Sequence, residues 1–221
     1  MLKTCSKEKM EHILSGQPEG KNTRFLNAAH SLWYRFKNYE KNPPFYITDK
    51  DGTEVAFVFA TYSQRTKYIN LYEIVTIEGA EGKGYASEIW SEVMEDAYNS
   101  GMRRLKISCT PSSVTWHYRN GLVFWAVDPS GSLRSDQPLC ETREEQIKLR
   151  EQAIDDPSLV MPADSKVIEN LRKEDFPGDR FKINGKKYWA ICNAIDSVGE
   201  AWMRPHIMKQ QGATLSDFFE E

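Results

Sequence analysis

The segment from Ile69 to Gly101 constrains the fold more than any other part of the sequence. Its first part, Ile69 to Ile77, is rich in apolar and β-branched residues and predicts a β-strand. A glycine-rich segment, Glu78 to Ala86, follows directly. After it, apolar residues recur at helical spacing up to Gly101, and a glycine at that point is typical of a helix end. The sequence therefore predicts a strand, a glycine-rich turn and a long helix in direct succession.

The glycine-rich turn is suited to binding an anion. Gly82 and Gly84 leave the backbone bare where the helix begins, so that free N–H groups can face a ligand. The positive end of the helix dipole points to the same place, and both features favour a phosphate group. A P-loop ATPase is excluded, because no Gly-Lys-Ser/Thr sequence follows at the required spacing. We therefore predict a phosphate site of another kind at this turn.

Composition and charge predict a soluble, cytoplasmic protein. The chain has 221 residues, 40% of them hydrophobic, and can bury a full core without a disulfide or a metal ion. Its four cysteines have no paired spacing, so we expect free thiols in a reducing compartment and no metal site. Charged residues interrupt the segment from Met1 to Gly16, which argues against a signal peptide, and no later run reaches membrane-spanning length. The net charge of −3 gives no general attraction to nucleic acid.

A helix and a hairpin are predicted before the central segment. Asn22 or Thr23 is suited to cap a helix whose apolar residues keep helical spacing and which ends near Lys41. Two runs rich in aromatic and β-branched residues follow, Phe45 to Thr48 and Glu54 to Thr61, with turn residues between them. Together with the strand from Tyr68 to Ile77, they predict three antiparallel strands.

A second set of elements is predicted after the long helix. Met102 to Cys109 alternates as a strand does, and a short helix around Trp116 follows, which Gly121 closes. Leu122 to Val127 pairs with the residues from Ser132 onward in a closing hairpin. The predicted fold class is therefore α/β (α+β), with a mixed, mainly antiparallel twisted sheet flanked by helices.

The composition changes beyond Asp136, and we divide the chain into a core, residues 1–135, and a C-terminal extension, residues 136–221, packed on that core. The extension holds a highly charged helix over Glu141 to Ile154 and a short one over Ser165 to Lys173, both expected to be solvated. A hairpin over Phe181 to Ile191 follows, because its central Asn-Gly pair is typical of a type I′ turn.

The order of elements from Thr23 to Leu133 resembles the Gcn5-related N-acetyltransferase (GNAT) superfamily. In that family the loop reads Gln or Arg, two residues, Gly, one residue, then Gly or Ala. Gly84 and Ala86 fill the two small positions, whereas Glu81 stands where Arg or Gln is expected. A second family motif is matched by the sequence from Trp116 to Leu122, in which strict spacing puts a histidine at the family's tyrosine position.

The resemblance implies that the core binds acetyl-CoA as co-substrate. Its pyrophosphate would lie on the loop N–H groups, while the pantetheine would lie in a splay between the strands before and after the loop. A backbone N–H at Val75 or Ile77 would polarise the thioester carbonyl, and an amine would attack it directly. Lys83 is suited to reach a phosphate of the nucleotide. The residues expected to bind the co-substrate are Val75, Ile77, Gly82, Lys83, Gly84, Tyr85 and Ala86.

Acid and base candidates flank this loop in the sequence. Glu73 is the first choice as base, because it shares a strand face with Leu71, Val75 and Ile77, and an apolar face favours proton uptake by a carboxylate. Pairing of Glu73 with a lysine or arginine is the alternative. Glu78 is the second base candidate. The acid is Tyr118, favoured by chemistry, or His117, favoured by spacing, and an aromatic ring packed on the core is the alternative for both.

Three functions remain open at this stage. The leading interpretation is an enzyme, an N-acyltransferase acting on an amine-bearing small molecule or protein. The second is a GNAT-fold protein without chemistry that binds a protein partner or a second copy through the extension. Glu81 favours it, since a like charge about 4 Å from the pyrophosphate costs on the order of 4 kcal/mol at an effective dielectric of about 20. The third is a nucleic-acid base modifier that uses the basic-aromatic hairpin at 181–191.

Overall fold

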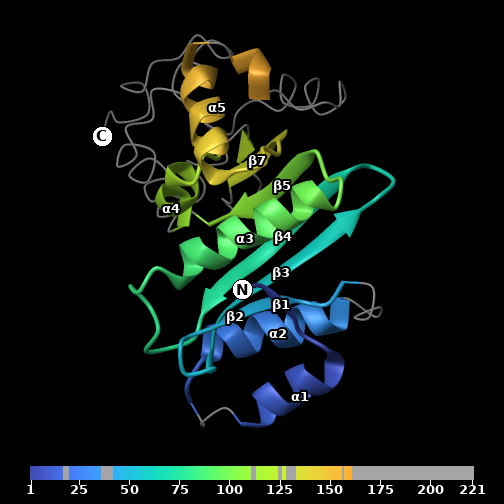
Figure 1. Cartoon of the computed structure of the whole chain (residues 1–221), viewed down its shortest axis with the longest axis vertical. Coiled ribbons are helices and arrows are strands. Elements are labelled where there is room, and N and C mark those ends of the chain that lie inside the picture. Colours follow the sequence, from blue (N-terminus) through green and yellow to red (C-terminus); the bar gives the residue numbers. More distant parts are fainter. Residues whose placement is uncertain are drawn as a thin grey trace, which may run out of the picture. The chain divides into compact units, whose positions relative to one another are not determined.

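The computed structural model describes residues 1–16, 20–35, 42–110, 113–123, 126–127, 133–155 and 157–160. They belong to two compact units, Met1–Arg103 and Arg104–Glu221 (Figure 1). The predicted helix over 165–173 and the hairpin over 181–191 lie outside the described residues. The division of the chain after residue 135 stays a prediction.

Four antiparallel strands lie in the part of the first unit that the structure describes. In the order in which they pair, they are β1 (Lys3–Thr4), β2 (Phe45–Thr48), β3 (Glu54–Ser63) and β4 (Tyr68–Thr76). The predicted hairpin and third strand are thus confirmed. The turn between β2 and β3 forms as its residues predict, because the Asp49 carboxylate accepts hydrogen bonds from the N–H groups of Asp51 and Thr53, both at 2.9 Å. The two-residue strand β1 was not predicted.

Three helices accompany this sheet: α1 (Lys7–Ser15), α2 (Thr23–Arg35) and α3 (Tyr85–Asn99). Helix α1, which was not predicted, begins at Ser6, whose hydroxyl accepts a hydrogen bond from the N–H of Lys9 at 3.2 Å. The predicted end of α2 near Lys41 lies outside the described residues. Helix α3 is confirmed and ends just before Gly101, which has a φ of +83°.

Helices α1 and α2 build one apolar cluster with the sheet. Phe25 of α2 lies against Phe57 of β3 with ring centroids 4.5 Å apart. The buried members of this cluster are Cys5, Met10, Ile13, Phe25, Ala28, Ala29, Phe57, Phe59 and Val75. Helix α3 packs on β3 and β4, and its own buried residues are Ile89, Trp90, Val93, Met94 and Ala97. The glycine-rich turn therefore joins a strand and a helix that pack against each other.

The described residues of the second unit contain three antiparallel strands, in the pairing order β5 (Arg104–Cys109), β7 (Leu133–Pro138) and β6 (Ala126–Val127). The helices among them are α4 (Val114–Arg119), α5 (Arg143–Asp155) and the 3₁₀ helix η3 (Pro157–Val160). The predicted strand and short helix are confirmed. The closing hairpin is confirmed only in part, because Ala126–Val127 pairs with β7, whereas Leu122 and Val123 are not in a strand and residues 128–132 lie outside the described residues. The charged helix is also present as α5, but it is not simply solvated, because Gln146 and Ala153 are buried.

The predicted α/β (α+β) class, with a mainly antiparallel sheet flanked by helices, is confirmed. No helix within the described ranges is both long and apolar enough to cross a membrane.

Candidate active site

The turn between β4 and α3 adopts a backbone that glycine favours. Gly79, Gly82 and Gly84 have φ values of +86°, +73° and +89°, and α3 begins directly after Gly84. A Cβ atom placed on any of the three would meet no atom within 4 Å. These glycines are therefore required by backbone conformation, and the space in front of them is open to a ligand.

The N–H groups of this turn are available to a ligand. The N–H of Ala80 donates to the carbonyl of Ile77, and those of Ser87 and Glu88 donate to the carbonyl of Gly84. Among the described residues, no acceptor takes a hydrogen bond from the N–H groups of Gly82 to Ala86. Because these donors lie at a helix N-terminus, the turn fits an anionic group such as a pyrophosphate.

Glu81 lies within this turn, and its side chain binds the backbone there. Its carboxylate accepts a hydrogen bond from the N–H of Gly79 at 2.6 Å. The side chain thus folds back onto the start of the turn, upstream of the available N–H groups. Lys83, the predicted phosphate contact, is exposed.

Strand β4 carries a bulge just before the turn. Glu73 pairs with Phe59, whereas Leu71 pairs with Ala60, so Tyr72 is an extra residue. Directly opposite residues share a face of the sheet, and Glu73 and Leu71 therefore lie on opposite faces. The prediction that they share a face was wrong, because the bulge changes the alternation. Bulges of this kind are frequent next to active sites.

Glu73 is paired with an arginine, which is the alternative that the sequence left open. The Arg24 guanidinium donates to Oε1 of Glu73 from Nε at 3.0 Å and from Nη2 at 2.7 Å. The Glu73 side chain is 29% exposed, and its Oε2 accepts no hydrogen bond from a described residue. One carboxylate oxygen is thus held in place by Arg24. The role of Glu73 as base stays a prediction.

Glu78, the second base candidate, holds the beginning of α2. Its carboxylate accepts a hydrogen bond from the N–H of Asn22 at 3.0 Å, and its own N–H donates to Oδ1 of Asn22 at 2.6 Å. Asn22 adopts a φ of +53°, which asparagine tolerates. The sequence identified Asn22 only as a helix cap. This reciprocal pair gives Glu78 a structural role besides the predicted one.

The register of β4 changes which backbone N–H groups can polarise a carbonyl. The N–H of Ile77 donates to the carbonyl of Val55 at 2.9 Å, so it is not available to a substrate. In an antiparallel pair such bonds recur at every second residue, which directs the N–H of Val75 to β3 as well. The N–H groups of Ile74 and Thr76 point to the other edge. Which backbone N–H polarises a carbonyl therefore stays a prediction.

The two acid candidates lie on α4 in the second unit, while the loop, Glu73 and Glu78 lie in the first. His117 is buried, with its ring edge-on to Trp116 at 4.9 Å between centroids. Tyr118 is half-buried, and the Arg150 guanidinium carbon lies 4.5 Å from the centroid of its ring. The greater exposure favours Tyr118 over His117 for contact with a substrate, and both roles stay predictions.

The cysteines of the described residues are free thiols. Burial raises the pKa of Cys109 to about 12, although a hydrogen bond with Ser113 opposes the shift. Burial and the nearby charge of Glu145 raise the pKa of Cys140 to about 11. Neither thiol is poised as a nucleophile near neutral pH. Within the described ranges, no three His, Cys, Asp or Glu side chains are grouped so as to hold a metal ion.

Comparison with known proteins gives one family and several solved structures. The acetyltransferase (GNAT) family is matched by residues 8–118, half of the 221-residue chain. Nourseothricin acetyltransferase is 19% identical, with 48% of this chain and 69% of that chain covered and a TM-score of 0.41. A spermidine N-acetyltransferase SpeG chimera from Vibrio cholerae and hSSAT is 10% identical, with 66% and 97% covered and a TM-score of 0.49.

A third solved structure is a histone acetyltransferase HPA2 and related acetyltransferase from Corynebacterium glutamicum. It is 15% identical, with 63% of this chain and 96% of that chain covered and a TM-score of 0.47. No curated protein matches the chain.

Proposed function

The chain belongs to the acetyltransferase (GNAT) family, and on that premise we propose that it is an N-acyltransferase that moves an acetyl group from acetyl-CoA to an amine. Members of this family use an acyl-CoA as co-substrate. The observation that carries the proposal is the turn from Gly82 to Ala86. Its N–H groups have no acceptor among the described residues and lie at the N-terminus of α3, which suits a pyrophosphate.

The residues around the turn supply the remaining functions. Bound acyl-CoA supplies an acyl thioester that is activated toward amines. Thr76 or Ile74 donates a backbone N–H to the developing oxyanion from the edge of β4 opposite β3. Lys83 adds a positive charge beside the phosphates. Direct attack by the amine agrees with the raised thiol pKa values of Cys109 and Cys140, which disfavour an acyl-cysteine intermediate.

Proton transfer is assigned to two side chains. Oε2 of Glu73 accepts the proton of the attacking amine as the carbon–nitrogen bond forms, while Arg24 holds Oε1 in place. The Tyr118 hydroxyl donates its proton to the thiolate that leaves as the carbon–sulfur bond breaks. His117 is the second choice as acid, because it is buried. Glu78 is the second choice as base, because its carboxylate binds the N–H of Asn22.

A second candidate function is favoured by Glu81. Its carboxylate at Gly79 places a negative charge in the turn that has to accept phosphates, which suits a protein that has lost co-substrate binding and binds a protein partner. The base modifier has no support from the described residues, because the hairpin over 181–191 lies outside them.

The leading proposal includes two further parts. The acceptor is an amine-bearing small molecule or protein, and the protein is located in the cytoplasm.

Calorimetric titration with acetyl-CoA and with CoA tests the proposal. We expect a Kd on the order of micromolar for the unchanged protein and no detectable binding for Gly84→Glu. Gly52→Glu is the matched control, because Gly52 also has a positive φ, +85°, and open space, but lies in the β2–β3 turn. A folded protein that binds neither compound at millimolar concentration would contradict the acyltransferase and favour the second candidate.

A further inference from the structure

One face of α5 is packed against α4 and the residues that follow it, all within the second unit (Figure 1). Arg143 donates from Nε to Oδ1 of Asn120 at 2.7 Å. The backbone of Gln146 lies so close to Gly121 that a Cβ there would be 2.5 Å from the Gln146 carbonyl carbon. Arg150 donates from Nη1 to the carbonyl of Tyr118 at 2.7 Å. Positions 143, 146 and 150 share one helix face, so these contacts form one continuous surface.

Arg150 makes two contacts with the same residue. Its Nη1 binds the Tyr118 carbonyl, and its guanidinium carbon lies 4.5 Å from the centroid of the Tyr118 ring. The Arg150 side chain is only 13% exposed, and its charge meets the carboxylate of Glu151 at 3.2 Å. Backbone and ring of Tyr118 are thus held by a single planar group.

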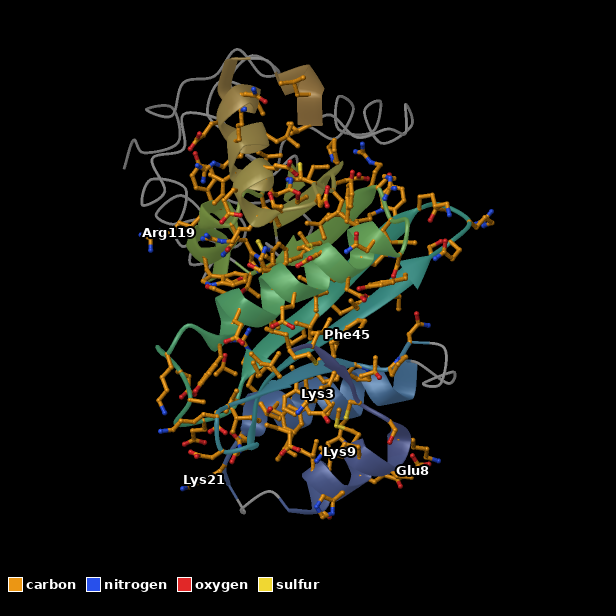
Figure 2. All side chains as sticks on the ribbon, in the orientation of Figure 1. Lys3, Glu8, Lys9, Lys21, Phe45 and Arg119 are labelled. Carbon is orange, nitrogen blue, oxygen red and sulfur yellow. The ribbon has the colours of Figure 1, made fainter. Side chains whose placement is uncertain are left out.

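The contacts of the Arg150 guanidinium do not give the greatest possible stability. Its Nε is buried and has no hydrogen-bond partner among the described residues, which costs stability. Arg119, the next residue after Tyr118, is by contrast exposed (Figure 2). Arg150 therefore contacts Tyr118, whereas Arg119 is an exposed arginine next to the same tyrosine and can serve as a control.

We propose that Arg150 is a positioning residue that fixes the Tyr118 ring for proton donation. This inference rests on the proposed function, because it takes Tyr118 as the acid. It also gives the C-terminal extension a role in the reaction, since α5 lies in the extension and sets the geometry of α4.

A kinetic double-mutant cycle tests the catalytic half of the inference. We expect Arg150→Gln to lower kcat about tenfold and to leave the KM for acetyl-CoA unchanged. This loss is smaller than the ~10²- to 10⁴-fold contribution of an acid or base group, because the acid itself is still present. In a Tyr118→Phe background the same change should have no further effect, because the group that it positions is gone. Arg150→Lys should recover part of kcat, and Arg119→Gln should leave it unchanged. Equal losses in both backgrounds would overturn the proposal.

Fluorine NMR tests the positioning half without any need for activity. The protein is labelled with 3-fluorotyrosine, and the Tyr118 signal is assigned by its loss in Tyr118→Phe. We expect Arg150→Gln and Arg150→Lys to move or broaden this signal while Arg119→Gln leaves it in place. An unmoved signal in folded Arg150 variants would overturn the inference. If the unchanged protein shows no acyl transfer, the proposed function fails, and this signal alone decides whether Arg150 positions Tyr118.

Discussion

Glu81 is the residue whose charge bears most directly on the proposed function. Its carboxylate accepts the N–H of Gly79, and a glutamine amide oxygen can accept the same bond without the charge. We expect Glu81→Gln to bind acetyl-CoA about twofold to fivefold more tightly, the size of a charge effect at a helix N-terminus. The gain should shrink at high salt, because the site is exposed.

Titration calorimetry at low and high salt checks this prediction. Glu95→Gln is the control, since Glu95 is an exposed carboxylate on α3 that lies several turns from the loop. Weaker binding by Glu81→Gln would mean that the carboxylate stabilises the loop in its binding conformation more than it repels the phosphates.

Tyr62 links β3 to α3 through its hydroxyl, which donates to the Asp96 carboxylate at 2.9 Å. Burial, and then the charge and hydrogen bond of Asp96, raise the pKa of Tyr62 above its usual 10.0. The fold therefore favours the neutral phenol. Below pH 10 this preference contributes fully to stability, and it is lost as the pH rises, because the unfolded chain loses the proton first.

We therefore expect the free energy of unfolding to fall between about pH 9.5 and 11.5 with a slope of up to ~1.4 kcal/mol per pH unit from this residue. Urea unfolding across this range checks it. Tyr62→Phe should be less stable at neutral pH but should show a shallower decline. Parallel pH curves for the two proteins would exclude Tyr62 as the source.

At the scale of elements, the contact between Gly121 and α5 fixes how two helices meet. Gly121 has a φ of +86°, and a Cβ there would lie 2.6 Å from the carbonyl oxygen of Gln146 and 2.7 Å from the N of Ile147. These are backbone atoms, so a rotamer change cannot relieve the clash. We expect Gly121→Ala to lower the free energy of unfolding by about 2–5 kcal/mol, from left-handed strain plus overpacking.

Gly101→Ala is the control variant for Gly121→Ala in the measurement of the free energy of unfolding. Gly101 has a φ of +83°, but a Cβ there would meet only the flexible end of the Lys67 side chain at 4.0 Å. It should therefore cost only the ~1–2 kcal/mol of left-handed strain. Equal losses in chemical denaturation would show that α5 can move away from α4.

Elements with local signals could be predicted from the sequence. The Asp49–Gly52 turn, α3 and the glycine loop each depend on residues that lie next to one another. The bulge at Tyr72 could not, because it exists only in the pairing of β4 with β3. For the same reason the sequence could not show that the Ile77 N–H bonds to β3, and it missed Arg24 as the partner of Glu73. The charged face of α5 looked solvated, but arginine stems can pack as apolar residues do, and the buried Gln146 amide is hydrogen-bonded to the backbone of Pro138 and Cys140.

At the scale of the whole molecule, the predicted boundary after residue 135 falls inside β7, between Ser135 and Asp136. Asp136 is buried and binds the Arg104 guanidinium, with Oδ1 2.8 Å from Nη2. Gln137 is fully buried, and its side chain accepts from the N–H of Val123 at 2.8 Å and donates to the carbonyl of Gly121 at 2.9 Å. A cut at 135 removes the carboxylate that binds Arg104 and leaves the buried N–H of Val123 without its acceptor.

We therefore expect a fragment of residues 1–135 to fail to fold cooperatively, whereas a fragment of residues 1–160 should unfold in a single transition. The longer fragment keeps α5 and η3, whose Val160 is fully buried and which packs on α5 and β7. Circular dichroism melts of both fragments and the full chain check this. A cooperative melt of residues 1–135 would support the predicted boundary and would make α5 an addition to a complete core. Its absence would make α5 part of the unit that carries Tyr118, as the proposed role of Arg150 requires.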